Sequence, residues 1–362
     1  MSADFKKYSY FLIFLIIAGC LEDPEIPSAS FGINDEARLL YYLEKRGDYI
    51  NSGSAPSIIE AAEVYANLND YLVIDVRSQQ EFINGHIPGA LNIQNTDLLN
   101  YFLNNNINNF AKVVLVSQTG QSAAYYTCLL ILSGYQNVFS MNFGLASWNI
   151  DFAGLWQDHS KNFFGITTFN NTIYQDNDIS PLPDISFSTS LKTSEEKLRE
   201  RVRILLNEGF KDNPEEIHKD YNASILIEDL FNEETGFDSS INIVCYGNES
   251  LYLTSTLLAG DPLAGFGHPP GTVFYSQNFA LRSTEKLQSL PLNKMIVIYS
   301  YSGQLSAYAA AYLRILGYDV KSLLFGANNL FYSRMIWNSL LVNYAFTSSR
   351  IMNYPYVMGN EE

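Results

Sequence analysis

Short apolar segments alternate with helical patterns along the first half of the chain. The runs at 71–76 (YLVIDV) and 113–116 (VVLV) have the composition of strands buried on both faces of a parallel sheet. A helical pattern at 36–50 precedes them, and a second one at 122–134, ending in glycine, follows them. Another short strand is expected at 137–141. Strands and helices that alternate in this way, joined by short loops, predict an α/β domain with a mostly parallel sheet flanked by helices.

The second half of the chain repeats the first. The helical pattern at 36–50 and a second predicted helix at 57–68 have counterparts at 194–210 and 223–232, and the strand 71–76 has one at 241–246. Three landmarks share one spacing. GHIPGA and GHPPGT place His86 and His268 182 residues apart, while SQTGQSA with SYSGQLSA and the two later Gly-Tyr pairs are each 183 apart. A constant offset through separate motifs predicts two tandem domains.

The repeat sets the expected domain organisation. Residues 1–19 would form a signal peptide, 20–35 a tether, 36–160 the first domain, 161–190 a linker and 191–345 a second, degenerate domain.

The N-terminus carries a targeting pattern. Lys6 and Lys7 precede an apolar run that is short for a membrane span, and this run ends in Ile-Ala-Gly-Cys at Cys20. The ending resembles a bacterial lipobox, in which the cysteine is lipidated and becomes the first residue of the mature chain. An uncleaved anchor is the alternative. Both interpretations place the rest of the chain in the cell envelope, tethered to a membrane and facing the periplasm or the exterior.

Charge and composition exclude several function classes. The formal net charge of −16 argues against a nucleic-acid surface, which needs a basic stripe. The three cysteines and four histidines are widely scattered, so neither a metal site nor a disulfide framework is expected. The sequence contains no nucleotide-binding or hydrolase motif, and we expect no cofactor.

The motifs of the first repeat resemble those of rhodanese (sulfurtransferase) domains. The resemblance rests on Asp75-Val-Arg77, Glu81-Phe82, GHIPGA around His86, the Gly120 loop, and Phe143-Gly144 with Trp148. The second repeat keeps GHPPG around His268, the Gly303 loop and Phe325-Gly326. In the second repeat, however, Cys245 stands where the first has Asp75. The resemblance therefore implies a tandem rhodanese-like protein.

The resemblance also implies what the two loops have lost. In the family, a cysteine three residues before the loop glycine carries the persulfide, and a residue soon after the glycine often supplies a cation. The positions of the cysteine are taken here by Ser117 and Ser300, and the following positions read Gln121-Ser122 and Gln304-Leu305. A serine hydroxyl without an adjacent base is a poor nucleophile, and oxygen cannot carry a persulfide. Sulfur transfer at either loop is therefore not expected.

What remains of the loops is a set of backbone amides at a helix N-terminus, which favours an anion. Two interpretations stay open, a small-oxyanion site and a purely structural loop. The candidate anion-binding residues are Ser117, Gln118, Thr119, Gly120, Gln121, Ser122, Ser300, Tyr301, Ser302, Gly303 and Gln304. The residues expected to be structural are Asp75, Arg77, Glu81, His86 and His268, and the three tryptophans, Trp148, Trp156 and Trp337, are expected in the core or at the domain interface.

These observations favour a catalytically inactive binding protein that engages an envelope protein or a small oxyanion through the loops or the cleft between the domains. A sulfurtransferase that uses a relocated thiol is the alternative. Cys245 is its only plausible nucleophile, because it lies at the end of a predicted strand, where parallel sheets bind their ligands. A structural envelope protein with two vestigial loops is the third hypothesis.

Overall fold

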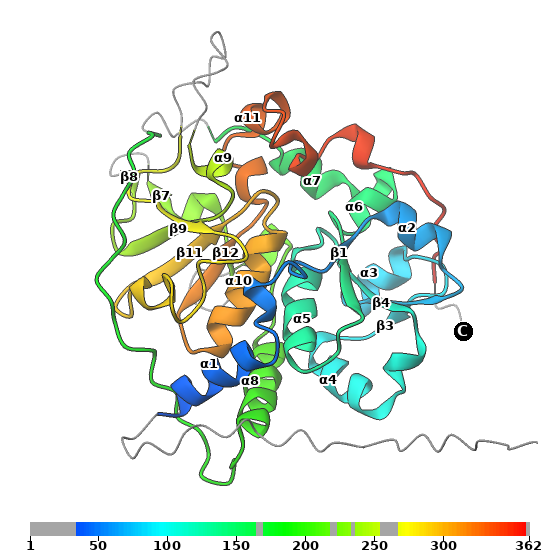
Figure 1. Ribbon diagram of the computed structural model, residues 1–362. Coiled ribbons are helices and arrows are strands. Elements are labelled where there is room, and N and C mark those ends of the chain that lie inside the picture. The colour runs from blue at the N-terminus through cyan, green and yellow to red at the C-terminus, as the bar shows by residue number, and fades with distance from the viewer. Residues whose placement is uncertain (1–33, 164–168, 218–222, 233–235, 254–266, 360–362) are drawn as a thin grey trace, which may run out of the picture.

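The computed structural model describes residues 34–163, 169–217, 223–232, 236–253 and 267–359. The proposed lipidation residue, Cys20, and the signal peptide lie outside the described residues. The chain forms two parallel sheets, one on each side of a central pair of helices (Figure 1).

The first sheet contains five parallel strands, and its helices connect them in the expected α/β manner. Its strand order is β1 (Ile58–Ile59), β5 (Val138–Met141), β4 (Lys112–Val116), β2 (Tyr71–Asp75), β3 (Leu91–Asn92). The helices of this half are α2 (Ala61–Ala66), α3 (Gln79–Asn84), α4 (Asn95–Asn104), α5 (Gln121–Leu132), α6 (Leu145–Trp148) and α7 (Gly154–His159).

The second sheet has the same order of equivalent strands. It runs β6 (Ser224–Ile225), β12 (Val320–Leu323), β11 (Met295–Tyr299), β9 (Ile241–Gly247), β10 (Val273–Ser276), again all parallel. A short antiparallel pair, β7 (Phe231–Asn232) and β8 (Gly236–Phe237), lies apart from it. The helices of this half are α9 (Glu249–Tyr252), α10 (Gln304–Ile315) and α11 (Tyr332–Trp337). The two sheets confirm the predicted fold class.

Two predicted helices are wrong, that at 57–68 in part and that at 223–232 throughout. Residues 223–232 form the short strands β6 and β7, with a single 3-10 turn, Ile227–Asp229, between them. Residues 57–68 were expected to be helical throughout, but Ile58 and Ile59 form the edge strand β1, and only the short helix α2 follows. The backbone of Ser57 accepts a hydrogen bond from Ser140 N at 3.0 Å, which joins this segment to β5. Branched side chains fit a strand at this edge, where Ile59 is buried.

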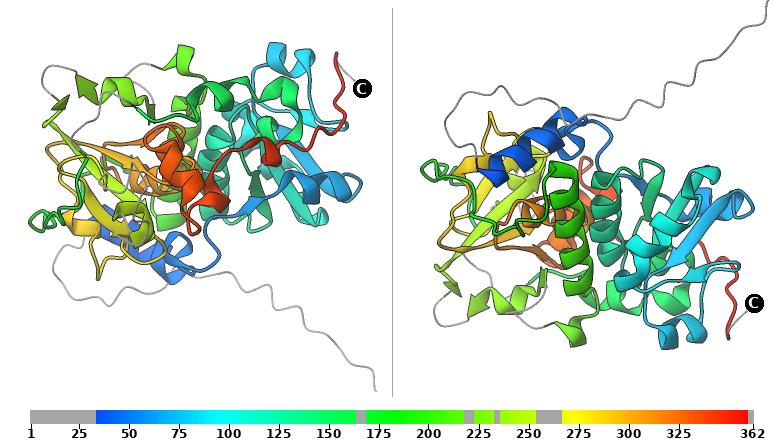
Figure 2. Two further views of the ribbon diagram at one scale, coloured as in Figure 1. Left: turned by 90° about the horizontal axis from the view of Figure 1, so that it is seen from above. Right: turned by 90° about the horizontal axis from the view of Figure 1, so that it is seen from below.

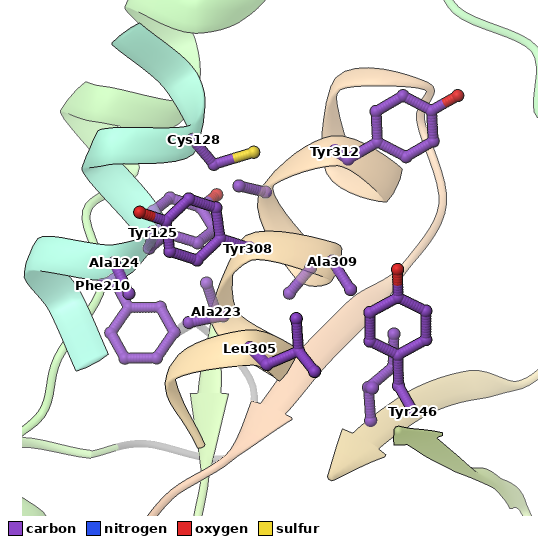
Figure 3. Packing of buried hydrophobic residues seen from close by; sticks show 14 of the residues in the cluster. Ala124, Tyr125, Cys128, Phe210, Ala223, Tyr246, Leu305, Tyr308, Ala309 and Tyr312 are labelled. Atoms are coloured by element: carbon purple, nitrogen blue, oxygen red, sulfur yellow. The ribbon is translucent and has the colours of Figure 1, made fainter. Parts of the chain in front are cut away.

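The helices α5 and α10 pack against each other between the two sheets (Figures 1 and 3). All twelve residues of α5 are buried, and in α10 only Arg314 is not. A helix that is apolar on every side belongs in a core rather than on a surface. Figure 3 shows Tyr125 and Cys128 of α5 facing Tyr308 of α10. Both helices begin at the candidate loops, so the interface brings the two loops together.

The two halves exchange their outer segments. Helix α1 (Asp35–Lys45) opens the first repeat but lies beside the second sheet, where Glu44 accepts a 2.7 Å hydrogen bond from Ser283 N. Helix α8 (Ser194–Glu208) opens the second repeat but contacts α4 and α5 of the first. The C-terminal segment returns to the first half (Figure 2). There the backbones of Val357 and His86 pair.

The tryptophans differ in their surroundings. Trp148 and Trp156 are fully buried, as expected. The expectation for Trp337 is wrong, because its side chain, at the end of α11, is 69 % exposed. Nothing in the six-residue helix α11 directs this position inward, since Arg334 and Met335 supply its buried face. No helix of the described ranges is long and apolar enough to cross a membrane.

Candidate functional site

The first loop (residues 117–122) joins β4 to α5 and places a hydroxyl at the helix N-terminus. Gly120 has φ +83°, and a Cβ there would approach Gly144 N to 2.6 Å, so the position requires glycine. The loop turns Ser117 inward, where its Oγ accepts hydrogen bonds from Gly120 N at 3.1 Å and Ala123 N at 3.4 Å. The serine oxygen thus lies within hydrogen-bond distance of two backbone amides at the start of α5.

A carboxylate of the chain itself occupies the open side of this loop. Asp212 comes from the segment after α8 and is 9 % exposed. Its Oδ2 accepts hydrogen bonds from Ser117 Oγ at 2.8 Å and Thr119 Oγ1 at 2.9 Å, and longer ones from Thr119 N at 3.3 Å and Ser122 N at 3.4 Å. Hydrogen bonds to an ionised acceptor are stronger than neutral ones. The loop therefore holds an anion, and that anion is internal.

The segment that carries Asp212 is fixed by packing on both sides. Tyr126 of α5 accepts a hydrogen bond from Phe210 N at 2.8 Å and donates one to Phe210 O at 3.2 Å. The Phe210 ring also lies 5.2 Å from the ring of Tyr125. Ser224, on β6, donates a hydrogen bond to Lys211 O. These contacts deliver the carboxylate to the first loop as part of the interface between the two halves.

A pocket of about 250 Å³ lies beside the Asp212 carboxylate. Its lining includes four acidic side chains and two basic ones: Glu81, Glu208, Asp212, Glu216, Arg77 and Lys211. Two of the acids are already in ion pairs, Glu216 with Lys211 at 2.7 Å and Glu208 with Arg314 at 2.7 Å. The excess of carboxylates opposes the entry of a dianion such as sulfate.

The second loop (residues 300–304) satisfies its serine differently. Ser300 Oγ accepts a hydrogen bond from Ser306 N at 2.9 Å and donates one to Ser306 Oγ at 3.1 Å. Ser306 Oγ in turn lies 2.8 Å from the hydroxyl of Ser322 on β12. Neutral hydroxyls fill this position, and Tyr301 of the same loop accepts a hydrogen bond from Asn248 N.

The two loop glutamines cross the domain interface and do not face an anion. Gln121 Oε1 accepts a hydrogen bond from Phe325 N at 2.9 Å, and Gln304 Oε1 accepts one from Phe143 N at 2.9 Å. Both phenylalanines have positive φ values, 57° and 59°. Each glutamine therefore satisfies a buried amide in a strained turn of the other half.

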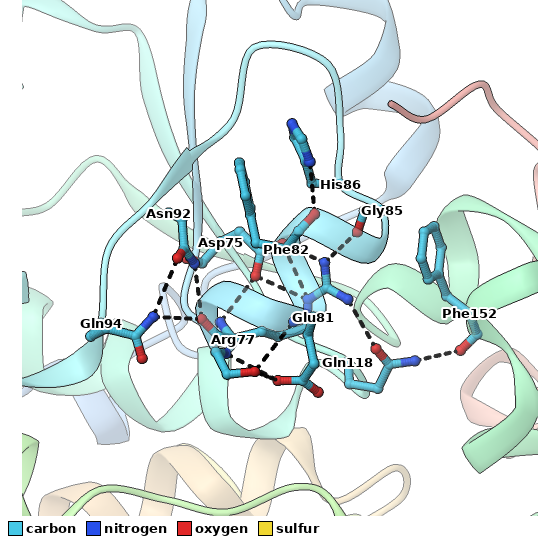
Figure 4. A network of polar contacts seen from close by, with 11 residues as sticks. Asp75, Arg77, Glu81, Phe82, Gly85, His86, Asn92, Gln94, Gln118 and Phe152 are labelled. Carbon is cyan, nitrogen blue, oxygen red and sulfur yellow. Dashed lines mark hydrogen bonds and ion pairs between the residues drawn. The ribbon is translucent and has the colours of Figure 1, made fainter. Parts of the chain in front are cut away.

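The Asp-x-Arg segment of the first repeat holds the surrounding turns together (Figure 4). Arg77 forms a buried ion pair with Asp75 at 2.6 Å and donates to Gly85 O at 2.7 Å, next to His86. It also donates to Gln118 Oε1 of the first loop at 3.2 Å. The side chain of Glu81 caps α3 through Ser78. Arg77 is consequently engaged by the protein and does not supply a cation to a ligand.

The second half obtains an equivalent arginine from a different element. Cys245 pairs with Tyr299 in the same register in which Asp75 pairs with Val116, which establishes the correspondence of the two positions. Where Arg77 donates to Gly85 O, the buried Arg334 of α11 donates to Gly267 O at 2.5 Å. It also donates to three carbonyls around α9, those of Ser250, Leu251 and Leu253.

The histidines of the two turns have structural contacts. The ring of His86 stacks on Phe82, and its Nδ1 lies 2.9 Å from Phe82 O. His268 stacks on Tyr252 and directs Nδ1 to Tyr252 O and Nε2 to Thr172 O, both at 2.9 Å. A carbonyl only accepts, so the His86 nitrogen that faces Phe82 O carries a hydrogen, whereas a neutral His268 ring donates to only one of its two carbonyls. Burial lowers the pKa of His268, although its two carbonyl neighbours act in the opposite direction.

The two described cysteines are buried and have weakly acidic thiols. Burial raises the pKa of the Cys245 thiol to about 12, and it raises that of Cys128 further. Neither side chain has any exposed surface. A thiolate, which is the nucleophilic form, is therefore scarce at both positions at neutral pH.

Sequence reasoning missed two residues, Asp212 and Arg334. Asp212 lies 95 positions after Ser117 in a short polar segment, and no local pattern marks it. Arg334 lies in a largely apolar segment, FYSRMIW, near the end of the second repeat. Two indirect signals for these residues were present in the sequence. The loop amides had no acceptor assigned to them, and the second repeat lacks the Asp-x-Arg pair, so each position required a partner from elsewhere in the chain.

Comparisons with known proteins find matches to part of this chain. A family model described as a rhodanese-like domain matches residues 60–151. The thiosulfate sulfurtransferase GlpE of Shewanella oneidensis is 31 % identical over 78 residues, which cover 21 % of this chain and 74 % of that protein. GlpE of Pseudomonas entomophila is 28 % identical over 83 residues, with coverages of 23 % and 74 %. A crystal structure of a rhodanese-related protein from Thermoplasma volcanium is 31 % identical to this chain, with a TM-score of 0.22. The match covers 25 % of this chain and 87 % of the Thermoplasma chain.

Proposed function

The chain belongs to the rhodanese-like domain family, and from this premise we propose that it is a catalytically silent, lipid-anchored binding protein of the bacterial cell envelope with two such domains. The observation that carries the proposal is the Asp212 carboxylate in the first loop. It lies between Ser117 and the neighbouring pocket, whose lining includes Asp212 but not Ser117, and it accepts the only hydroxyl proton that Ser117 has.

The chemistry of the two serines supports the loss of activity. Sulfur transfer requires a thiolate that becomes a persulfide, and Ser117 and Ser300 have oxygen at this position. Asp212 accepts the hydroxyl proton of Ser117, but a serine oxygen cannot carry a persulfide whether or not a base lies beside it. The hydroxyl of Ser300 is bonded to Ser306 and has no base beside it among its described contacts. Both loops keep the family's glycine-containing loop but lack its nucleophilic cysteine.

The alternative, sulfur transfer through Cys245, is less well supported. A relocated nucleophile has to reach thiosulfate as a thiolate. The Cys245 side chain is fully buried, and its pKa of about 12 leaves it protonated at neutral pH.

Of the two ligand classes considered, a partner protein is favoured over a free oxyanion. Both loops are satisfied internally, and the pocket beside the first is lined by more acids than bases. The surface near α11, in contrast, exposes large apolar side chains, among them Trp337 at 69 % and Leu340 at 66 %. Exposed apolar groups of this size are common at protein contacts.

The decisive experiment for the proposed function is a sulfurtransferase assay. In the reaction, cyanide accepts the outer sulfur of thiosulfate, giving thiocyanate and sulfite. We expect no thiocyanate from the full chain in detergent, nor from Ser117→Cys, because Asp212 still fills the loop. GlpE of Shewanella oneidensis serves as the positive control. Turnover by the parent chain that disappears in Cys245→Ser would establish the alternative.

The proposed anchor has its own test. Cys20→Ser should move the chain from the membrane fraction to the soluble fraction, or block its processing, and should abolish incorporation of labelled fatty acid. Unchanged lipid labelling of this variant would refute the lipoprotein assignment.

A further inference from the structure

We propose that the first loop is a binding site for a carboxylate, that Asp212 is its built-in ligand, and that a small free carboxylate binds there when the Asp212 side chain is removed. The inference rests on the proposed function, because it explains how a silent loop is kept closed. It assigns the site a ligand class different from the thiosulfate named for the sulfurtransferase relatives.

The donors converge on one atom. Two hydroxyls, from Ser117 and Thr119, and two backbone amides, from Thr119 and Ser122, all point to Asp212 Oδ2 at 2.8 to 3.4 Å. The helix N-terminus of α5 adds its partial positive charge. This is a complete set of partners for one carboxylate oxygen.

The donors are held in place without Asp212. Ser117 Oγ is fixed by Gly120 N and Ala123 N, and Trp156 Nε1 donates to Thr119 O at 3.1 Å. Gln121 Nε2 donates to Thr119 Oγ1 at 3.1 Å while its other end is bonded to Phe325. Removal of the carboxylate therefore leaves an ordered group of donors rather than a collapsed loop.

The surroundings select a monoanion. The pocket next to Asp212 has room for a small molecule. Two acids of its lining, Glu216 and Glu208, are in ion pairs, and Glu81, which caps α3, adds a negative charge without an ion pair among the described residues. Repulsion between like charges grows with the charge of the ligand, so a dianion is opposed about twice as strongly as a monoanion of the same size. Acetate and formate fit both the donors and the charge, whereas sulfate and thiosulfate fit only the donors.

The test is chemical rescue of Asp212→Ala in the full chain. Thermal unfolding is measured in sodium acetate, formate, sulfate and thiosulfate, each against sodium chloride of equal ionic strength. We expect acetate or formate to raise the melting temperature of Asp212→Ala by several degrees, with saturation, and to leave the parent chain unchanged. The effect should vanish in Asp212→Ala/Ser117→Ala, which lacks the shortest donor, and should be absent from Asp212→Asn, whose amide still fills the position.

Three results would overturn the inference: no rescue beyond chloride, equal rescue of the parent chain, or stronger rescue by sulfate and thiosulfate than by acetate. If Asp212→Ala does not fold in chloride, its refolding yield in acetate against chloride gives the same answer. Failure of rescue leaves the proposed function intact, because that function is judged by thiocyanate formation in the parent chain. Turnover by the parent chain would refute the proposed function whatever the rescue shows.

Discussion

The first and second loops have similar backbone conformations, but their serines have different hydrogen-bond partners. In the first, Ser117 donates to a buried carboxylate that arrives from the second repeat. In the second, Ser300 is bonded to the neutral hydroxyl of Ser306, six residues further along the same segment. One loop depends on a distant residue and a charge, while the other is satisfied locally.

The difference follows from the exchange of outer segments. Phe210 packs on Tyr125 and Tyr49 packs on Tyr308, so the two opening segments reach equivalent helices in opposite halves. Two residues after these rings come Asp212 and Asn51. Asp212 enters the first loop, whereas Asn51 Oδ1 accepts a hydrogen bond from Leu281 N at 3.1 Å and does not enter the second. The two opening segments are placed equivalently, and the difference between Asp212 and Asn51 determines that only the first loop contains a carboxylate.

The largest effect is expected from breaking the charged loop. Asp212→Ala leaves two buried hydroxyls and two amides without their acceptor, and should lower the free energy of unfolding by about 3 kcal/mol. Ser300→Ala in the neutral loop should cost about 1 kcal/mol. Urea unfolding of both variants and the parent measures the difference. Equal losses would mean that the carboxylate adds nothing beyond an ordinary hydrogen bond.

The contrast in how these loops are satisfied also shows what a sequence can reveal. The strands at 71–76 and 113–116, observed as Tyr71–Asp75 and Lys112–Val116, and the loop glycines could be predicted because each is marked by a run of neighbouring residues. The 183-residue offset could be predicted because such runs occur twice. The partners of the loops were not readable. Asp212 reaches Ser117 only after α8 packs across the interface, and Arg334 reaches the second turn from α11. The two-residue strand at Ile58 was also missed, because a pattern needs more residues than an edge strand supplies.

The glutamines that join the loops across the interface should give the next largest effect. Gln304→Ala removes an acceptor from Phe143 N and donors from two carbonyls, those of Gly120 and Met141. Gln121→Ala removes an acceptor from Phe325 N and a donor from Thr119. We expect losses of about 2 kcal/mol for each, from the unsatisfied buried amide.

Gln121→Arg provides a sharper version of this test. It places a charge in the interface and points a donor at the Phe325 amide, so it should destabilise the protein more than Gln121→Ala. Urea unfolding that ranks the two variants in the reverse order would contradict the assigned role of the amide oxygen.

The two histidine turns predict a smaller, pH-dependent difference. Because burial lowers the pKa of His268 below its ordinary value of 6.5, the unfolded chain binds a proton there more readily than the folded one. This contribution to stability is complete above pH 6.5 and is lost as the pH falls below that value. Its slope is at most about 1.4 kcal/mol per pH unit, the value for one proton.

Unfolding in urea between pH 5 and 7.5 measures this slope. The slope of the free energy of unfolding against pH should decrease in His268→Gln. It should persist in His86→Gln, the matched change in the other turn. If the free energy of unfolding of the parent chain instead rises as the pH falls, the carbonyls of Tyr252 and Thr172 raise the pKa of His268 more than burial lowers it.

The smallest expected effect concerns the thiol at the position of Asp75. With a pKa of about 12 and no exposed surface, Cys245 should not react with a disulfide reagent at pH 8 in the folded chain, and Cys128 should not react either. Cys20→Ser is used so that only these two thiols remain, and denaturant should release both. Rapid labelling of native Cys245 that is lost in Cys245→Ser would show that this position is accessible as a thiolate. The two repeats would then differ in chemistry, because the second would contain a reactive thiol at the position where the first has Asp75.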